Sequence, residues 1–470
     1  MSDILVLLRL ISSVLLAIAV SNGNFAARAD SSASNSSSVY APPTGAHPTS
    51  QPHTPFSGTP STTGALTATS IGKGISSGSV AAEATTYSSD GKLHNAEPAP
   101  FVPAGGIGTN GSTPVYNAKS DFDYESLALA LYQEWIELDL FQDGLSRFSE
   151  ADFSEAGLTS KDRDLISFMV AQEVGHATML SNILGASAPQ PCTYNYPYTT
   201  VREFIDFCQK LTRFGEAGVY GFLAHLNSRE AASLLTQSIT TEARQQMIFR
   251  QFGKLFPMPE WFEVGIPQSW AWTLLAPYIS SCPGNQTRLV WQNFPALRIL
   301  NQPSLATAGM TSNSSNGSAV NNTISPGINV VKTPNRSSNS SSSSDSDCGV
   351  TVTSKPAALS FAGRYVILQW ENAGKRVGPN NSYVTSSQAK TAKYVAWVSQ
   401  LNVTYTSLGP SHNGTYGYTV QPDLDTYEGD PAVNGTMFIA ITDDNPVLTP
   451  FNLSLINPHV VAGPAIYQAG

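Results

Sequence analysis

The sequence predicts an α+β protein, with a four-helix bundle, a small C-terminal β-rich unit and long disordered segments. Two observations support this prediction. From Asp121 to Glu263, 143 residues hold 20 of the chain's 34 acidic side chains, and apolar residues recur there at helical spacing. After residue 350, short β-branched and aromatic runs are separated by Gly, Pro and Asn, which is typical of antiparallel strands.

The composition excludes some classes of function. The chain has 470 residues, enough for two or three domains, and 41% of them are hydrophobic. Only 13% are charged, about half of the roughly 25% that is usual in soluble globular proteins. A formal net charge of −9 and the absence of a basic run exclude nucleic acid as a partner, because phosphate binding needs a basic face.

The N-terminus predicts export. Residues 4–20 are mostly apolar and contain one charge, Arg9, and Ala27-Arg28-Ala29 follows a polar break, so we interpret residues 1–29 as a signal peptide. A membrane anchor is the alternative, but a span of 17 residues is at the short limit for crossing a bilayer. We therefore expect no stable membrane span after cleavage, and a secreted protein that is extracellular or associated with the cell wall.

Glycosylation sequons and cysteines agree with that compartment. Sequons in ordered-looking sequence begin at Asn402, Asn413, Asn434 and Asn452, which predicts a glycoprotein. The four cysteines are Cys192, Cys208, Cys282 and Cys348. In an oxidising compartment we expect two disulfides, and three pairings are open. A zinc site is the competing interpretation, but the chain has no Cys-x-x-Cys pair.

Shifts in composition predict the domain boundaries. Residues 30–118 form a Ser/Thr/Pro-rich lead and residues 301–349 a Ser/Asn-rich linker, and both are predicted to be disordered. The helical domain then spans 119–300 and the β-rich domain 350–470. Strands are predicted within 365–370, 394–398 and 437–442.

The helical domain shows four apolar stripes, each with a glutamate in it. The stripes run over 127–148, 166–183, 205–226 and 231–252. In chain order they carry Glu134, then Glu173 with His176, then Glu216, and finally Glu242 with Gln245. Gly185 is the expected end of the second helix, and Thr200-Val-Arg-Glu203 is a capping box that begins the third. The aromatic segment 268–275 is predicted to be a fifth helix.

Four carboxylates inside one bundle predict a metal site. Burial of an unpaired carboxylate is costly, and four that converge would repel one another unless a cation lay among them. Fe and Mn accept carboxylate oxygen together with imidazole. Glu173 and His176 share one helical face, as a ligand pair in a bundle core requires. The candidate ligands are Glu134, Glu173, His176, Glu216, Glu242 and Gln245.

Several motifs have a counterpart in a known family. They include Glu173-Val-Gly-His176, Thr241-Glu-Ala-Arg-Gln-Gln-Met247 and the segments 266–272, 452–459 and 463–467. On these motifs the chain resembles the ferritin-like superfamily, and it is similar to the fungal secreted ferritin-like family of stress-response and late-sexual-development proteins. The resemblance covers most of 120–300 and 350–470. It implies a di-metal carboxylate site in an exported protein linked with stress or development, without an established reaction.

Two departures from the family pattern keep a second interpretation open. Gln245 stands where the general di-iron pattern has a second histidine, and Phe141 stands where ferritins often have tyrosine. Both lower the expected redox turnover. The site is therefore either a Fe or Mn pair or a polar core without metal, in which Gln172, His176 and Gln245 hydrogen-bond the glutamates. In the second case the protein is a non-catalytic cell-wall or surface protein that uses the bundle as a scaffold, so whether it is an enzyme stays open.

Overall fold

The computed structural model describes residues 118–284, 286, 288–303, 359–409, 414–424, 426 and 435–470. The predicted signal peptide lies outside these residues, as do most of the predicted lead and most of the linker. The predictions for those segments, including their disorder, stay predictions. Within the described residues, no helix is both long enough and apolar enough to cross a membrane.

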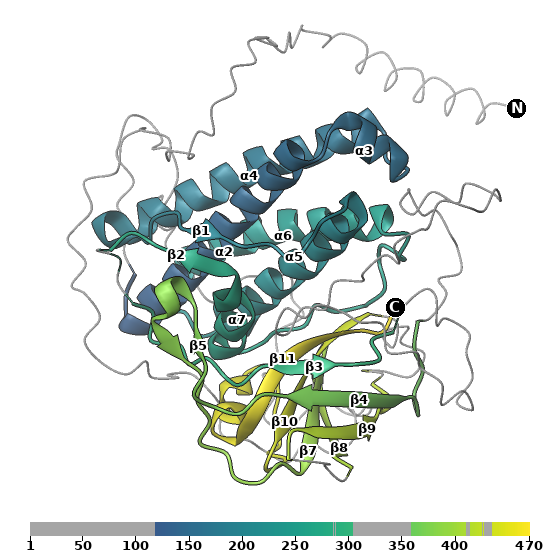
Figure 1. The fold of residues 1–470 in the computed structure, drawn as a ribbon. Coiled ribbons are helices and arrows are strands. Elements are labelled where there is room, and N and C mark those ends of the chain that lie inside the picture. Colours follow the sequence, from purple (N-terminus) through teal and green to yellow (C-terminus); the bar gives the residue numbers. More distant parts are fainter. Residues whose placement is uncertain are drawn as a thin grey trace, which may run out of the picture. The chain divides into compact units, whose positions relative to one another are not determined.

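The helical domain contains the four predicted long helices. The α-helices are α2 (Asp121–Arg147), α3 (Glu150–Glu155), α4 (Ser160–Leu184), α5 (Val201–Leu223), α6 (Arg229–Phe252) and α7 (Gln268–Leu275). Helix α2 packs against α4 and α5 packs against α6, while α2 also contacts α5 (Figure 1). The predicted fifth helix is α7, with the bounds expected from the sequence. The short helix α3 was not predicted.

Hydroxyl side chains cap the long helices as their sequences require. The N-cap residues Ser120, Thr159, Thr200 and Ser228 each accept a hydrogen bond from the backbone N–H three residues later. Gly185 ends α4 with a φ of 64°, a conformation that favours glycine. The predicted capping box of α5 is only half formed, because the Glu203 carboxylate accepts from Thr199. Local capping therefore sets where the helices begin and end.

The β-rich unit is a sandwich of two antiparallel sheets. One sheet has the strand order β11-β10-β7-β8 and the other β3-β4-β9. Their strands are β3 (Leu297–Ile299), β4 (Tyr365–Trp370), β7 (Tyr394–Ser399), β8 (Asn402–Ser407), β9 (Tyr416–Val420), β10 (Thr436–Thr442) and β11 (Val460–Gln468). Two small ladders pair β1 (Thr193–Tyr194) with β2 (Ile279–Ser281) and β5 (Arg376–Val377) with β6 (Tyr383–Val384).

Apolar side chains from both sheets meet in one core. Val366, Leu368 and Trp370 of β4 lie in it beside Trp397 of β7 and Ile439 of β10. The three predicted strands are thus confirmed as β4, β7 and β10. Strand β3 lies inside the range 119–300 that was predicted to be helical, yet it pairs with β4. The β unit therefore takes its first strand from before the linker.

Hydrogen bonds join the helical domain to the sandwich at several places. The Gln209 side chain donates to Gln468, at 2.9 Å. Arg250 donates to the carbonyl of Gly470, also at 2.9 Å, and the Thr436 N–H donates to the Glu260 carboxylate at 2.8 Å. All of these groups belong to buried or half-buried parts of the fold. The β unit therefore packs against the bundle through specific polar contacts.

The cysteine prediction is only half right. Cys192 and Cys282 form a disulfide, because pairing of β1 with β2 brings the segments that carry them together. Cys208 is a free thiol and is fully buried on α5, so the expectation that it is disulfide-bonded is wrong. A free cysteine packs in a core as a small hydrophobic residue, so Cys208 can be buried without a disulfide partner. Cys348 lies outside the described residues.

Candidate metal centre

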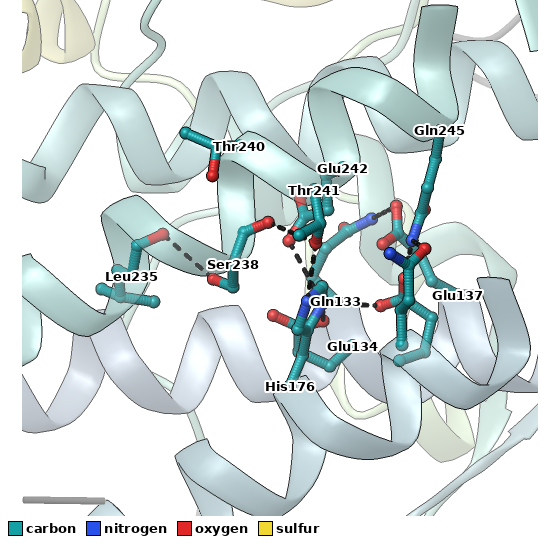
Figure 2. Close-up of polar contacts among 12 residues, drawn as sticks. Gln133, Glu134, Glu137, His176, Leu235, Ser238, Thr240, Thr241, Glu242 and Gln245 are labelled. Carbon is teal, nitrogen blue, oxygen red and sulfur yellow. Dashed lines mark hydrogen bonds and ion pairs between the residues drawn. The ribbon is translucent and has the colours of Figure 1, made fainter. Parts of the chain in front are cut away.

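Three helices bring five ligand-type side chains together inside the bundle. Helix α2 supplies Glu134 and Glu137, α4 supplies Glu173 and His176, and α6 supplies Glu242 (Figure 2). All five are buried. Each helix places these residues on the face that packs against its neighbours, which is why the apolar stripes of the sequence contain them.

His176 lies at the centre of this group. Its Nδ1 atom is 3.3 Å from Glu134 Oε2, 3.2 Å from Glu173 Oε2 and 3.8 Å from Glu242 Oε1. Its Nε2 atom is 2.8 Å from the hydroxyl oxygen of Thr241. Imidazole therefore contacts three carboxylates through one nitrogen and one hydroxyl through the other.

The hydroxyl of Thr241 fixes the tautomer of His176. Thr241 donates its single proton to the carbonyl of Ser238, at 2.7 Å, so its oxygen accepts from His176 Nε2. Nε2 then carries a proton, and in the neutral ring Nδ1 presents its lone pair to the carboxylates. A histidine held in this way is oriented as metal-binding histidines are, with the non-ligating nitrogen hydrogen-bonded.

The ligand atoms form two groups with one shared member. Glu134, His176 and Glu242 make up one group, and Glu134, Glu137 and Glu173 the other. Within each group the ligand atoms all lie within 4.8 Å of one another. Because Glu134 belongs to both, it would be the ligand shared by two cations bound in these groups. One position has an imidazole nitrogen, whereas the other has carboxylate oxygen alone.

Burial and mutual repulsion shift the pKa values of the carboxyl groups. Burial raises the pKa of Glu134 to about 8. It also raises the pKa of Glu137 and of Glu242 well above the usual range, and neighbouring carboxylates add to the rise in both. Burial acts on Glu173 in the same direction, but His176 outweighs it and the pKa of Glu173 falls. Without a cation, the cluster can hold few negative charges.

The pKa of the imidazole also rises, but burial opposes this rise instead of causing it. Burial alone would lower the pKa of His176, but the Glu134 and Glu173 carboxylates outweigh burial and raise it to about 12. One imidazolium therefore faces four carboxyl groups, and most of these must be protonated when no other cation is present.

The residues present fit a pair of divalent cations. Glu137 Oε2 is a buried atom without a hydrogen-bond partner, which is costly for a carboxylate, and Glu134 Oε2 has the ion-pair contact with His176 Nδ1 but no hydrogen bond. Four ionised carboxylates and a neutral imidazole carry a charge of −4 in total, and two divalent ions balance it. Oxygen-rich ligand sets with one imidazole suit Fe and Mn.

Two of the sequence-predicted ligands take other roles. Glu216 on α5 is not part of either group, since its Oε2 lies 3.4 Å from Arg213 Nη1. Arg213 also pairs with Glu260 and Glu263. Gln245 donates from Nε2 to Glu173 Oε1, so it orients a ligand. The polar-core interpretation predicts this hydrogen bond from Gln245 to a glutamate.

Glu137 is the residue that the sequence interpretation missed. It follows Glu134 by three positions, the same spacing that joins Glu173 to His176, so the signal was present on α2. The side chain of Gln133 donates to Glu137 Oε1 at 3.1 Å and holds it in the cluster. Thr241 was also missed as a functional residue, because it lies beside Glu242 and off the apolar stripe.

Comparison with known proteins agrees with this geometry. The family described as "Ferritin-like domain" matches residues 121–254, which contain all five clustered residues. The chain is also similar to "Protein rds1" of Schizosaccharomyces pombe (strain 972 / ATCC 24843). The two are 49% identical over 375 residues, which cover 79% of this chain and 87% of the relative. The similarity thus extends beyond the helical domain.

Proposed function

Because this chain belongs to the ferritin-like family of Protein rds1, we propose that its bundle binds a pair of Fe or Mn ions. The ligands are Glu134, Glu137, Glu173, His176 and Glu242. The observation that carries the proposal is that two buried groups of ligand atoms share Glu134. Inward-facing glutamates together with a Glu-x-x-His pair on facing helices are the ligand set of carboxylate di-metal sites in four-helix bundles.

A bound metal pair would supply redox chemistry, either the dismutation of peroxide or the oxidation of ferrous iron by an external oxidant such as dioxygen. The protein's own residues prepare the site for it. Gln245 holds Glu173 through a hydrogen bond, and Thr241 holds His176 with Nδ1 facing inward. Phe141 packs on Phe249 with ring centroids 5.3 Å apart, so apolar surface adjoins the site and excludes water from the bundle.

Metal analysis of the purified, full-length protein tests the proposal. We expect about two Fe or Mn ions per chain and a rise in the melting temperature when either ion is added to metal-free protein. Glu134→Gln removes the shared ligand and should lose both ions, whereas His176→Ala should lose the ion of its own group. Glu216→Gln is the matched control, because it changes a buried glutamate outside both groups and should leave the metal content unchanged.

A protein that contains neither metal and shows no thermal shift would sink the metal proposal. It would favour the second candidate, a non-catalytic surface protein with the bundle as scaffold. One observation supports this candidate: His176 pairs with Glu134 and Glu173 directly, so part of the cluster is satisfied without a cation. Unchanged metal content in both Glu134→Gln and His176→Ala would place the metal elsewhere in the chain.

We also propose that the protein is an exported glycoprotein that acts in stress response or development. The apolar N-terminus and the Cys192–Cys282 disulfide support export. Of the three sequons that begin at described residues, those at Asn380 and Asn402 are exposed and are the better glycan acceptors, whereas Asn452 is buried and accepts from Thr449. Mass analysis of protein from culture medium, before and after glycosidase treatment, should show a mature N-terminus after Ala29 and a glycan on Asn402.

A further inference from the structure

The outer face of the β3-β4-β9 sheet presents three exposed tyrosines. Tyr365 on β4 is 59% exposed, and Tyr416 and Tyr418 on β9 are 37% and 41% exposed. The inward residues of these strands, such as Val366 and Leu368, fill the core of the sandwich. A solvated sheet face normally carries small polar or charged side chains. Three large rings on one face are therefore an exception that suggests a binding surface.

The three rings form one continuous row. Tyr416 and Tyr418 are two residues apart on β9, so their side chains leave the same face about 7 Å apart. Tyr418 lies opposite Ile367, and the ring centroids of Tyr365 and Tyr418 are 5.8 Å apart. The row thus runs along β9 and crosses onto the start of β4.

The backbone holds this row in place. A Cβ atom at Gly409 would lie 2.5 Å from the ring of Tyr418, so the absence of a side chain there lets the ring lie against the chain. Gly409 N–H donates to the Tyr418 carbonyl at 2.7 Å. Asn301 donates to the Tyr365 carbonyl at 2.9 Å and accepts from Ile367 N–H at 2.8 Å. The rings are therefore presented by a fixed scaffold, which lowers the entropy cost of binding.

Polar side chains lie beside the rings. The register places Arg298, Gln369 and Tyr416 in one row across the three strands. Arg298 is 3.9 Å from the carboxylate of Glu371, which also pairs with Lys375 at 2.9 Å. The sheet face thus combines aromatic rings with an amide and a guanidinium that is paired with a carboxylate.

We propose that this face, formed by Tyr365, Tyr416, Tyr418 and Gln369, binds neutral glycan chains. Pyranose rings have apolar C–H faces and hydroxyl edges, which match phenol rings flanked by hydrogen-bonding groups. Tyrosine supplies large amphipathic contact area with few rotatable bonds. Ile367 lies on this face opposite Tyr418 but is half-buried, so the phenol rings supply most of the exposed apolar contact area. The proposal is independent of the metal centre.

Binding to defined glycans tests this proposal. The full chain would be titrated by calorimetry with laminarihexaose and chitohexaose, and pulled down on insoluble β-1,3-glucan and chitin. We expect binding to at least one of them, and a loss of about tenfold or more in the double variant Tyr365→Ala/Tyr418→Ala. Tyr418→Phe keeps the ring and should retain most of the affinity.

Phe168→Ala is the matched control. Phe168 is 64% exposed on α4, far along the chain from the sheet, so its removal should leave glycan binding unchanged. Circular dichroism and metal content of each variant show that the fold is intact. The proposal is overturned if the wild-type protein binds none of the four glycans, if the double variant binds as tightly, or if its only defect is loss of self-association in sedimentation velocity.

Discussion

Two groups of carboxylates lie at the bundle, and the protein neutralises them in different ways. Around Arg213, the carboxylates of buried Glu216, of Glu260 and of exposed Glu263 pair with a guanidinium of the chain itself. Around His176, three carboxylates contact a single imidazole, and beside them the buried Glu137 Oε2 has no hydrogen-bond partner. The first group has a permanent internal cation, whereas the second is short of positive charge.

The difference lies in the basic partner of each group. Arginine stays charged at any pH that the protein meets, so the Arg213 group keeps its cation whether or not a metal ion is bound elsewhere. Histidine can lose its proton and become a ligand, so the group around His176 can exchange its protons for metal ions. Carboxylates paired with Arg213 thus stabilise contacts between segments of the chain, whereas the carboxylates around His176 form a site for a ligand.

Replacement of Arg213 tests this contrast and has the largest expected effect on stability. Arg213→Met removes the cation that pairs with the buried carboxylate of Glu216. We therefore expect the free energy of unfolding to fall by about 3–5 kcal/mol. Urea denaturation measures the loss. Metal content per folded chain should not change, because Arg213 is not part of either ligand group. A loss below about 1 kcal/mol would show that the group is not held by its arginine.

Replacement of Thr241 tests how the proposed metal ligand His176 is oriented. Thr241→Val keeps the shape of the side chain but removes the acceptor for His176 Nε2, so the imidazole loses its fixed orientation. We expect metal affinity to fall by about 10- to 100-fold, with both ions still bound at saturation. Competition with a chelator of known affinity for Mn²⁺ measures the change.

Thr240→Val is the matched control for that substitution. Thr240 is exposed, and its hydroxyl donates to the Gln237 carbonyl on the same helix. Its loss should leave metal affinity within about twofold of the wild-type value, because no candidate ligand is held by it. Equal effects of the two substitutions would contradict the orienting role of Thr241.

Much of the fold was predictable from the sequence because it depends on local patterns. Apolar residues at helical spacing located the four long helices, and hydroxyl caps and Gly185 placed several of their ends within a few residues. The alternation in β4 gave a strand with the observed bounds. The strand β3 was not predictable in the same way, because its three residues become a strand only by pairing with β4, far away in the chain.

The metal centre was predictable only in part, for a similar reason. Glu134, Glu173, His176 and Glu242 lie on apolar stripes, and the structure brings them together. Glu137 was overlooked because one glutamate per helix was expected. Glu216 has the same local signal as the others, but its partner Arg213 also binds Glu260 and Glu263, which lie on a loop that no periodic pattern describes.

The pH dependence of stability is the smallest of the expected effects. It directly tests whether the cluster around His176 lacks positive charge when no metal is bound. In metal-free protein the pKa of Glu134 rises from 4.5 to about 8, so its folded form binds a proton more tightly than the unfolded form. Its stabilising contribution is present below pH 4.5 and is lost as the pH rises to 8. The pKa of His176 rises from 6.5 to about 12, so its contribution is also lost with rising pH.

Scanning calorimetry at pH 5.5 and pH 8 with a chelator should therefore show a lower melting temperature at pH 8. Added Mn²⁺ should reverse this order, since ligands must be deprotonated to bind metal and metal affinity rises with pH. Glu134→Gln should weaken the pH dependence of the metal-free protein and abolish the reversal by Mn²⁺. Glu216→Gln is the matched control and should keep the reversal. Burial raises the pKa of Glu216 to about 8 as well, but Glu216 pairs with Arg213 and binds no metal ion. If Mn²⁺ raises the melting temperature equally at both pH values, metal ions do not displace protons in this cluster.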